Sequence, residues 1–216
     1  MTGRPGKVIA NITISADGYV AGASQTAERP FGDDAGDGFG DLLPAWMFDR
    51  PEENRAEVEE IGPYAAVIMG RNMFGPVRGD WTGNWTGWWG DDPVFHCPVF
   101  VLTHYTQEPQ PMDGGTPYHF VTDGIEAALH QARTAAGDGN VAILGGAETI
   151  NQYLAAGLLD ELRLHVVPLV LGAGARLFEG VPQLRLEQVK SHAANEVTHL
   201  TYRVQGEGIR TWSSTC

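Results

Sequence analysis

The sequence predicts an α/β protein with a mostly parallel central sheet, helices on both faces and an antiparallel C-terminal hairpin. Two observations support this class. Short β-branched or continuously apolar runs alternate with segments of helical periodicity, which is the order of parallel strands joined by helices. The last two apolar runs are instead separated by a glycine-rich turn. Because no linker interrupts this pattern, one domain is expected over 1–216, with 205–216 as a tail.

The expected strands are short, as buried strands are. They span 7–14, 65–69, 98–103, 117–121, 141–144, 161–171 and 197–204. The first is followed by the turn "SADGYVAG", in which Asp17-Gly18 provides the turn residues. The last two strands are expected to pair around the turn "GAGARLF".

Three helices are expected between these strands. In 51–61, Pro51 suits the first helical position. A second helix lies between Asp123 and Gly137, where Asp123 and Glu126 have the spacing of a capping box. The third spans 147–156 and stops at Gly157.

Two long loops stand out by composition. Residues 22–44 are acidic and glycine-rich, but their carboxylates miss the spacing of a calcium-binding EF-hand, so a solvated loop is favoured over a metal site. Residues 78–93 hold four tryptophans in "GDWTGNWTGWWGDDP". An interaction surface is one interpretation; rings that pack over the domain are the favoured one.

Composition excludes several classes. A net charge of −13 argues against nucleic acid as a partner. The two cysteines, Cys97 and Cys216, form neither a disulfide framework nor a metal-ligand spacing, and no metal is expected. The first residues lack an apolar run long enough for a signal peptide or a membrane span, so no membrane partner and a cytoplasmic location are expected.

Three strand ends carry turns suited to ligand binding: 69–72, 102–104 and 144–149. In open α/β sheets, ligands bind beyond the carboxyl ends of the strands, where helix N-termini favour anions. Gly145-Gly146 would let the backbone approach a pyrophosphate, although such a pair alone also fits a plain turn. The first helical turn would follow as Ala147, Glu148 and Thr149.

The combination of motifs resembles a known family. "MGRNMF" looks like the Gly-Arg-x-Thr segment of dihydrofolate reductases. "ILGGAETINQYLAAGLLDELRLHVVPLVLGAGARLF" is similar to the reductase domain of riboflavin biosynthesis and its bacterial relatives, and "ITISADGYVAG" matches their first strand and turn. The resemblance implies a dihydrofolate-reductase-like fold, an NADPH site and commonly a homodimer.

The resemblance also implies which residues bind the cofactor. Gly145 and Gly146 match the family's glycine pair, often joined by a cis peptide, beside the pyrophosphate. The remaining matches are Gly70, Arg71 and Asn72 at the adenosine phosphates, Thr103 and His104 beside the adenosine, and Ile12 and Thr13 along the nicotinamide. Arg71 suits a 2′-phosphate. Two positions depart from the family: Met73 stands where it has threonine, and Leu144 where riboflavin-pathway reductases carry glutamate.

The substrate half of the site is less defined. "LPAWMF" at 43–48 matches the first helix of dihydrofolate reductases and places Trp46 where they have a pterin-binding carboxylate. Asp17 and Asp49 are candidate proton donors, Asp49 on the helix face of Trp46; a turn role for Asp17 and a solvated charge for Asp49 are the alternatives. His165 is expected to be a hydrogen-bonded core residue.

The expected function is hydride transfer from NADPH to a small heterocyclic or carbonyl substrate that is neither dihydrofolate nor the riboflavin-pathway intermediate. A non-catalytic protein that binds a nucleotide or drug on the same fold remains the alternative.

Overall fold

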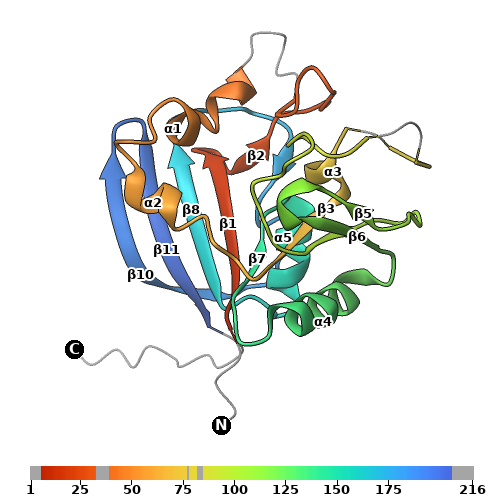
Figure 1. Cartoon of the computed structure of the whole chain (residues 1–216). Coiled ribbons are helices and arrows are strands. Elements are labelled where there is room, and N and C mark those ends of the chain that lie inside the picture. The colour runs from red at the N-terminus through yellow and green to blue at the C-terminus, as the bar shows by residue number, and fades with distance from the viewer. Residues whose placement is uncertain (1–5, 33–38, 77, 82–84, 206–216) are drawn as a thin grey trace.

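The computed structural model describes residues 6–32, 39–76, 78–81 and 85–205. Within them a nine-stranded sheet forms the centre of the molecule (Figure 1). In spatial order the strands are β10 (Arg185–Ala194), β11 (Val197–Gln205), β8 (Glu161–Val167), β1 (Val8–Ser15), β7 (Val141–Ile143), β3 (Ala66–Gly70), β4 (Val99–Leu102), β6 (Pro117–Val121) and β5 (Gln110–Pro111). Two short strands, β2 (Tyr19–Ala21) and β9 (Ala175–Arg176), pair separately.

Helices cover both faces of the sheet, as predicted. On one face lie α4 (Gly124–Ala136) and α5 (Ala147–Ala155), whose buried residues pack against Val8, Ala10 and Ile14 of β1. On the other lie α1 (Ala45–Phe48) and α2 (Arg55–Glu59), over β1, β8 and β11 (Figure 1). The short α3 (Arg71–Phe74) follows β3, and the 3₁₀ turns are η1 (Phe39–Leu42) and η2 (Asp113–Gly115).

Strand β1 has different neighbours along its length. Its first residues, Val8 to Ala10, pair in parallel with β7. On its other edge, Ile9 to Ser15 pair in parallel with β8. Because β7 ends at Ile143, the half of β1 beyond Ala10 has no strand beside it on that edge. The sheet therefore opens at the carboxyl end of β7, where the strand order changes direction, as expected for a ligand site in an α/β sheet.

Apolar packing holds this opening in place. Ile150, Tyr153 and Leu154 of α5 are buried against the sheet, as the helical spacing predicted. Burying a side chain of this size stabilises a fold by about 1.5–3 kcal/mol. Gly157 has a φ of +66° just after the helix, which fits the predicted stop. The start of α5 is thus fixed against β1 and β3.

The C-terminal hairpin differs from the prediction. It is formed by β10 and β11, not by 161–171 with 197–204, although β8 and β11 are antiparallel neighbours. Strand β10 went unrecognised because it lies at the sheet edge and nearly all its side chains are exposed, which leaves no apolar alternation to detect. The edge position explains why its sequence is polar.

Two helix predictions also need correction. The helix expected over 51–61 is regular only in α2, after turns at 51–54. Helix α4 begins beside Asp123 as expected, but the Asp123 side chain makes no capping hydrogen bond. The expected capping box is therefore not formed.

The tryptophan-rich loop packs onto the domain, which is the interpretation that its sequence favoured. The ring of Trp81 meets Phe74 and Phe120 edge-on, and the indole N–H of Trp85 donates to the carbonyl of Phe74 (3.0 Å). Residues 82–84 of this loop, 33–38 of the acidic loop and the 206–216 part of the predicted tail lie outside the described residues.

Candidate functional site

Two helices begin side by side at the opening of the sheet, and each begins at a glycine. Gly70 precedes α3 and Gly146 precedes α5, so no side chain caps either helix. The N–H of Gly70 donates to the carbonyl of Gly145 (2.7 Å). A Cβ on Gly70 would lie only 2.4 Å from Oγ1 of Thr149, so only glycine allows this approach. Among the described residues, no side chain accepts from the first N–H groups of α5, an arrangement typical of helix starts that bind anions.

The glycine pair has the local geometry that the resemblance implied. Gly145 and Gly146 are joined by a cis peptide bond, and Gly145 has a φ of +116°. A Cβ on Gly145 would contact Ile12 (3.4 Å) and Met73 (3.9 Å). At Gly146 the Cβ direction is open, with no atom of the described residues within 4 Å. Ile12 and Met73 thus lie beside Gly145 just beyond β7, while the Cβ direction of Gly146 faces open space.

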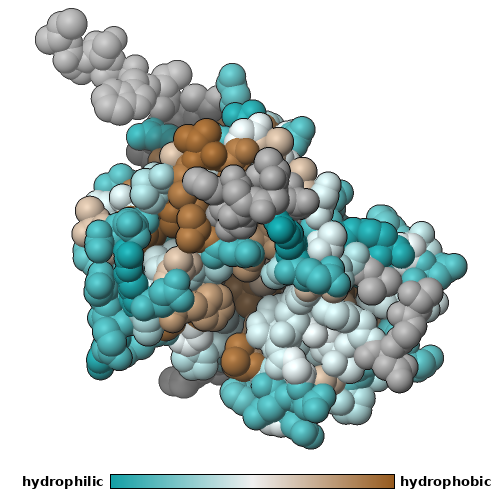
Figure 2. Space-filling model, turned by 90° about the horizontal axis from the view of Figure 1, so that it is seen from above, coloured by the Kyte–Doolittle hydropathy of each residue, from teal (hydrophilic) through white to brown (hydrophobic). Residues whose placement is uncertain are grey.

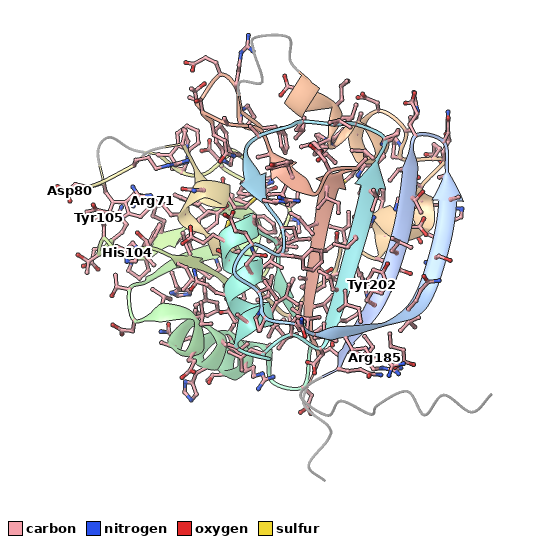
Figure 3. The ribbon with its side chains drawn as sticks, turned by 180° about the vertical axis from the view of Figure 1, so that it is seen from behind. Arg71, Asp80, His104, Tyr105, Arg185 and Tyr202 are labelled. Carbon is pink, nitrogen blue, oxygen red and sulfur yellow. The ribbon has the colours of Figure 1, made fainter. Side chains whose placement is uncertain are left out.

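Contacts with an aromatic ring and two hydrogen bonds hold the side chain of Arg71, the first residue of α3. Its guanidinium lies 3.3 Å from the ring centroid of Trp81, a cation–π contact. It also donates to Oγ1 of Thr103 (3.1 Å) and to the carbonyl of Gly79 (3.2 Å). Burial, with the nearby charge of Arg78, lowers the pKa of Arg71. Figure 3 shows Arg71 beside Tyr105 and His104. The contacts hold Arg71 in one orientation.

The remaining cofactor candidates surround the same two helix starts. Asn72, His104 and Glu148 are exposed, whereas Ala147 is buried under the first turn of α5. Leu144 is half-buried, and its N–H donates to the carbonyl of Ile68 (3.0 Å). The structure thus brings the sequence-predicted cofactor residues to one edge of the sheet.

Thr13 and Trp46 meet on the other side of β1. Trp46 is only 3% exposed, and its indole N–H donates to Oγ1 of Thr13 (2.9 Å). Figure 2, which looks down on the carboxyl ends of β1 and β8, shows a hollow bordered by apolar surface. Three apolar side chains are exposed on nearby segments: Leu42 in η1, Phe48 in α1 and Val170 in the loop after β8. This side of the opening is largely apolar.

A buried histidine pair lies beneath Trp46. His165 stacks on the Trp46 ring (centroids 4.3 Å apart), and His199 meets it edge-on (5.0 Å). The Nδ1 atoms of the two histidines are 2.7 Å apart, which is hydrogen-bond distance. Their Nε2 atoms contact the Oδ1 atoms of Asn11 (2.8 Å) and Asn54 (2.9 Å). His165 is therefore a hydrogen-bonded core residue, as expected.

Burial keeps this pair uncharged. It lowers the pKa of His165 to about 3, and the neighbouring charges of His199, Arg163 and Lys190 act in the same direction. Burial also lowers the pKa of His199, although the carboxylate of Glu57 opposes it. Because burial disfavours a charge on either ring, the pair can position Trp46 but is poorly suited to donate a proton to a substrate.

Glu57 and His192 extend this cluster to the surface. One ligand atom each from Glu57, His192 and His199 lie within 4.8 Å of one another, the distance at which a metal could be shared. Both ring nitrogens of His199 are already hydrogen-bonded, and the ammonium of Lys190 lies 3.2 Å from Glu57. Burial raises the pKa of Glu57, but the hydrogen bond from Lys190 and the other favourable interactions together outweigh it, so the net pKa is lowered. The cluster is an ion-pair network.

The two candidate proton donors occupy different environments. The Asp17 carboxylate accepts from the hydroxyl of Ser15 (2.6 Å) and from the N–H groups of Leu171 and Gly172. Burial raises the pKa of Asp17, but these hydrogen bonds together have the larger effect and the net pKa is lowered. This fits a carboxylate that anchors a turn. Helix α1 ends at Phe48, so Asp49 is exposed instead of sharing the buried face of Trp46. These environments give neither carboxyl group a clear role in proton transfer.

Comparison with known proteins identifies the family. Residues 6–200 match the RibD C-terminal domain family. The chain belongs to this family. Two curated proteins of Bacillus subtilis (strain 168) also match part of it: YwjB, 34% identical over 74 residues, and YyaP, 32% identical over 89 residues. These segments span 42% and 47% of the two proteins, less than half of either length.

Solved structures share the fold. A putative riboflavin biosynthesis protein from Shewanella sp. PV-4 is 24% identical, with a TM-score of 0.62 over 93% of this chain and 99% of the other. A dihydrofolate reductase from Enterococcus faecalis complexed with NADP(H) is 15% identical, with a TM-score of 0.54 over 93% and 97%. RibD of Acinetobacter baumannii is 16% identical, with a TM-score of 0.55 over 94% of this chain and 59% of its own. The dihydrofolate-reductase-like fold predicted from the sequence is confirmed.

Several residues of the site were not predicted. Trp81 was noted only as part of a packed loop, and Asn11, His199 and Asn54 were not singled out. A signal was present within the strand that became β1: Asn11 and Thr13 are two residues apart in an otherwise apolar run, so they share a face. Of the helices in the described residues, none is long and apolar enough to span a bilayer.

Proposed function

We propose that this protein is an NADPH-dependent reductase that transfers a hydride to a small carbonyl, imine or heterocyclic substrate. One observation carries the proposal: two uncapped helix starts meet through the Gly70–Gly145 hydrogen bond (2.7 Å) at the opening between β1 and β7. Free N–H groups at these adjacent helix starts, together with the dipole of α5, favour a diphosphate. Membership of the RibD C-terminal domain family supports the same cofactor class.

The cofactor would extend in two directions from this point. Arg71, stacked on Trp81 and bonded to Thr103, would bind the 2′-phosphate of the adenosine half. Ile12 and Thr13, on the half of β1 that has no neighbour beyond Ala10 on the β7 side, would lie along the nicotinamide. When bound, NADPH would supply the hydride, and the chain would hold it and exclude water.

The substrate is proposed to be neither dihydrofolate nor the riboflavin-pathway aminopyrimidine. A protonated pterin needs a buried carboxylate partner, and the resemblance of "LPAWMF" would put Trp46, which is 3% exposed, in the corresponding place. Leu144 stands where riboflavin-pathway reductases carry glutamate. We expect negligible oxidation of NADPH with dihydrofolate and weak oxidation at most with the aminopyrimidine, measured by absorbance. Robust dihydrofolate reduction would contradict this placement of Trp46.

Gly146→Val tests the cofactor site. Its φ of −73° suits valine and no atom of the described residues lies within 4 Å of the new Cβ, so the variant should fold. The same Cβ would occupy the space proposed for the pyrophosphate. Titration calorimetry should detect NADPH binding to the wild type and none to Gly146→Val. Ala155→Val, at the exposed far end of α5, is the matched control and should bind normally. If all three proteins bound NADPH equally, the glycine pair would be a structural turn and not part of the cofactor site.

A binding protein without turnover is the second candidate. The three hydrogen bonds that anchor Asp17 in its turn and the exposure of Asp49 favour it, because they give neither acid a clear role in protonating a substrate. NADPH binding without NADPH oxidation across a panel of aldehydes, ketones, imines and nitrogen heterocycles would support this candidate over the reductase.

A further inference from the structure

Among the described residues, the hydroxyl of Thr13 has no acceptor for the hydrogen that it could donate. A threonine hydroxyl offers one hydrogen and two lone pairs. One lone pair accepts the indole N–H of Trp46 at 2.9 Å, and within the described residues this is the only hydrogen bond of the Thr13 side chain. Thr13 is half-buried, on the part of β1 beyond its pairing with β7. Its hydrogen therefore remains available at the opening of the sheet.

Trp46 is held so that this arrangement is fixed. Its ring lies against His165, the residue paired with Thr13 across β1 and β8, and against His199. Its backbone carbonyl accepts from Nδ2 of Asn54 (3.0 Å). Asn54 in turn contacts His199, so ring and backbone are tied to one hydrogen-bonded network. The indole N–H cannot leave Thr13 without disturbing this buried network.

We infer that Thr13 donates a hydrogen bond to the substrate, and that the substrate presents a neutral acceptor there, such as a carbonyl oxygen or an unprotonated ring nitrogen. A substrate that covered Thr13 with a donor would leave the hydroxyl hydrogen without an acceptor, and an unsatisfied buried donor costs about 1–3 kcal/mol. Trp46 is a positioning residue, since it acts through Thr13. This inference rests on the proposed reductase function, because it assumes that the substrate lies in the opening beside Thr13, next to the nicotinamide along which Thr13 is proposed to lie.

Two bicyclic compounds test the direction of the hydrogen bond. Quinoline carries a ring nitrogen that accepts, and indole carries an N–H that donates. Both are titrated into protein labelled with ¹⁵N-tryptophan in the presence of NADP⁺, and the indole signal of Trp46 is identified by its loss in Trp46→Phe. Quinoline should shift this signal and bind more tightly than indole.

Thr13 variants supply the matched comparison. Thr13→Val keeps the shape of the side chain and removes the hydroxyl, whereas Thr13→Ser keeps the hydroxyl. Quinoline should bind about three- to tenfold more weakly to Thr13→Val and almost unchanged to Thr13→Ser, while indole should not distinguish them. Trp46→Phe should lower the preference for quinoline over indole while the circular dichroism spectrum stays that of a folded protein.

Three outcomes would overturn the inference: quinoline affinity that is equal in the wild type and Thr13→Val, tighter binding of indole than of quinoline, or no response of the Trp46 signal to quinoline. Repeating the titrations without NADP⁺ separates this inference from the proposed function. If the wild type does not bind NADPH in calorimetry but still responds to quinoline in the absence of NADP⁺, the proposed reductase function alone is refuted. Normal NADPH binding with no Thr13 dependence would refute this inference alone.

Discussion

Arg71 is prepared for a phosphate before any ligand is present. Its guanidinium is stacked on Trp81 and bonded to Thr103, so little side-chain freedom would be lost on binding. Arg71→Ala should therefore lower the preference for NADPH over NADH by roughly 1–3 kcal/mol, measured as the ratio of the two dissociation constants. Arg71→Lys keeps the charge but lacks the planar guanidinium, so it should retain only part of the preference for NADPH. A wild type that binds both cofactors equally would refute the role.

His165 couples stability to pH. Its folded pKa of about 3 lies below the ordinary value of about 6.5, so the unfolded chain takes up the proton first as pH falls. The stabilisation is complete above pH 6.5 and is lost below it, by about 2 kcal/mol between pH 7 and pH 5. His165→Gln should have a shallower decline of unfolding free energy over this range, measured in urea.

An exposed histidine provides the control for that measurement. His130→Gln on α4 should keep the wild-type dependence on pH, because the His130 side chain is exposed. If His165→Gln and His130→Gln decline alike, the buried pair does not carry the effect. The carboxylates with lowered pKa, Glu57 and Glu161, lose their stabilisation at more acidic pH, outside the range compared.

At the scale of elements, the tryptophan-rich loop is packed against the end of α3. Gly75 ends that helix, and a Cβ there would lie 2.2 Å from Nε1 of Trp85, which donates to the carbonyl of Phe74. Gly75→Ala should displace the indole and lower the unfolding free energy by about 1–3 kcal/mol. In a Trp85→Ala background the same change should cost much less. If Gly75→Ala lowered the unfolding free energy equally in both backgrounds, a clash with Trp85 would not be the cause.

Elements that bury an apolar face were predictable, and those that do not were missed. The runs that became β1, β3, β4 and β6 are apolar and lie inside the sheet, so their sequences indicate strands. Strand β10 is polar along its exposed length and left no such pattern. Glycines marked the cofactor half because a close approach such as that of Gly70 to Thr149 admits no side chain. The histidine pair joins residues 34 apart in sequence, a contact that no local pattern records.

At the scale of the whole molecule, one sheet face stands out. Figure 3 shows β10 and β11 with no helix in front of them on that side. Half-buried apolar side chains on these two strands are Leu186, Leu200, Tyr202 and Val204. We propose that a second copy of the chain covers them, forming a homodimer, because burying such surface between two copies is favourable.

Sedimentation velocity tests this dimer. The wild type should sediment as a dimer, and Tyr202→Glu should shift it to a folded monomer, since a charge at the centre of an apolar interface is costly. His130→Glu, on exposed α4, should leave the dimer intact. A wild type that is monomeric at micromolar concentration would refute the proposal.

The meeting of two glycine-started helices also bears on how such proteins diversify. The proposed pyrophosphate site uses main-chain atoms at Gly70 and Gly146, whereas the proposed substrate side uses the side chains of Thr13, Trp46 and His165. Main-chain recognition tolerates sequence drift, while a side chain can be exchanged by one codon. Selection, or a mutant library limited to the substrate side, could therefore change what is reduced without rebuilding the part that would bind the reductant.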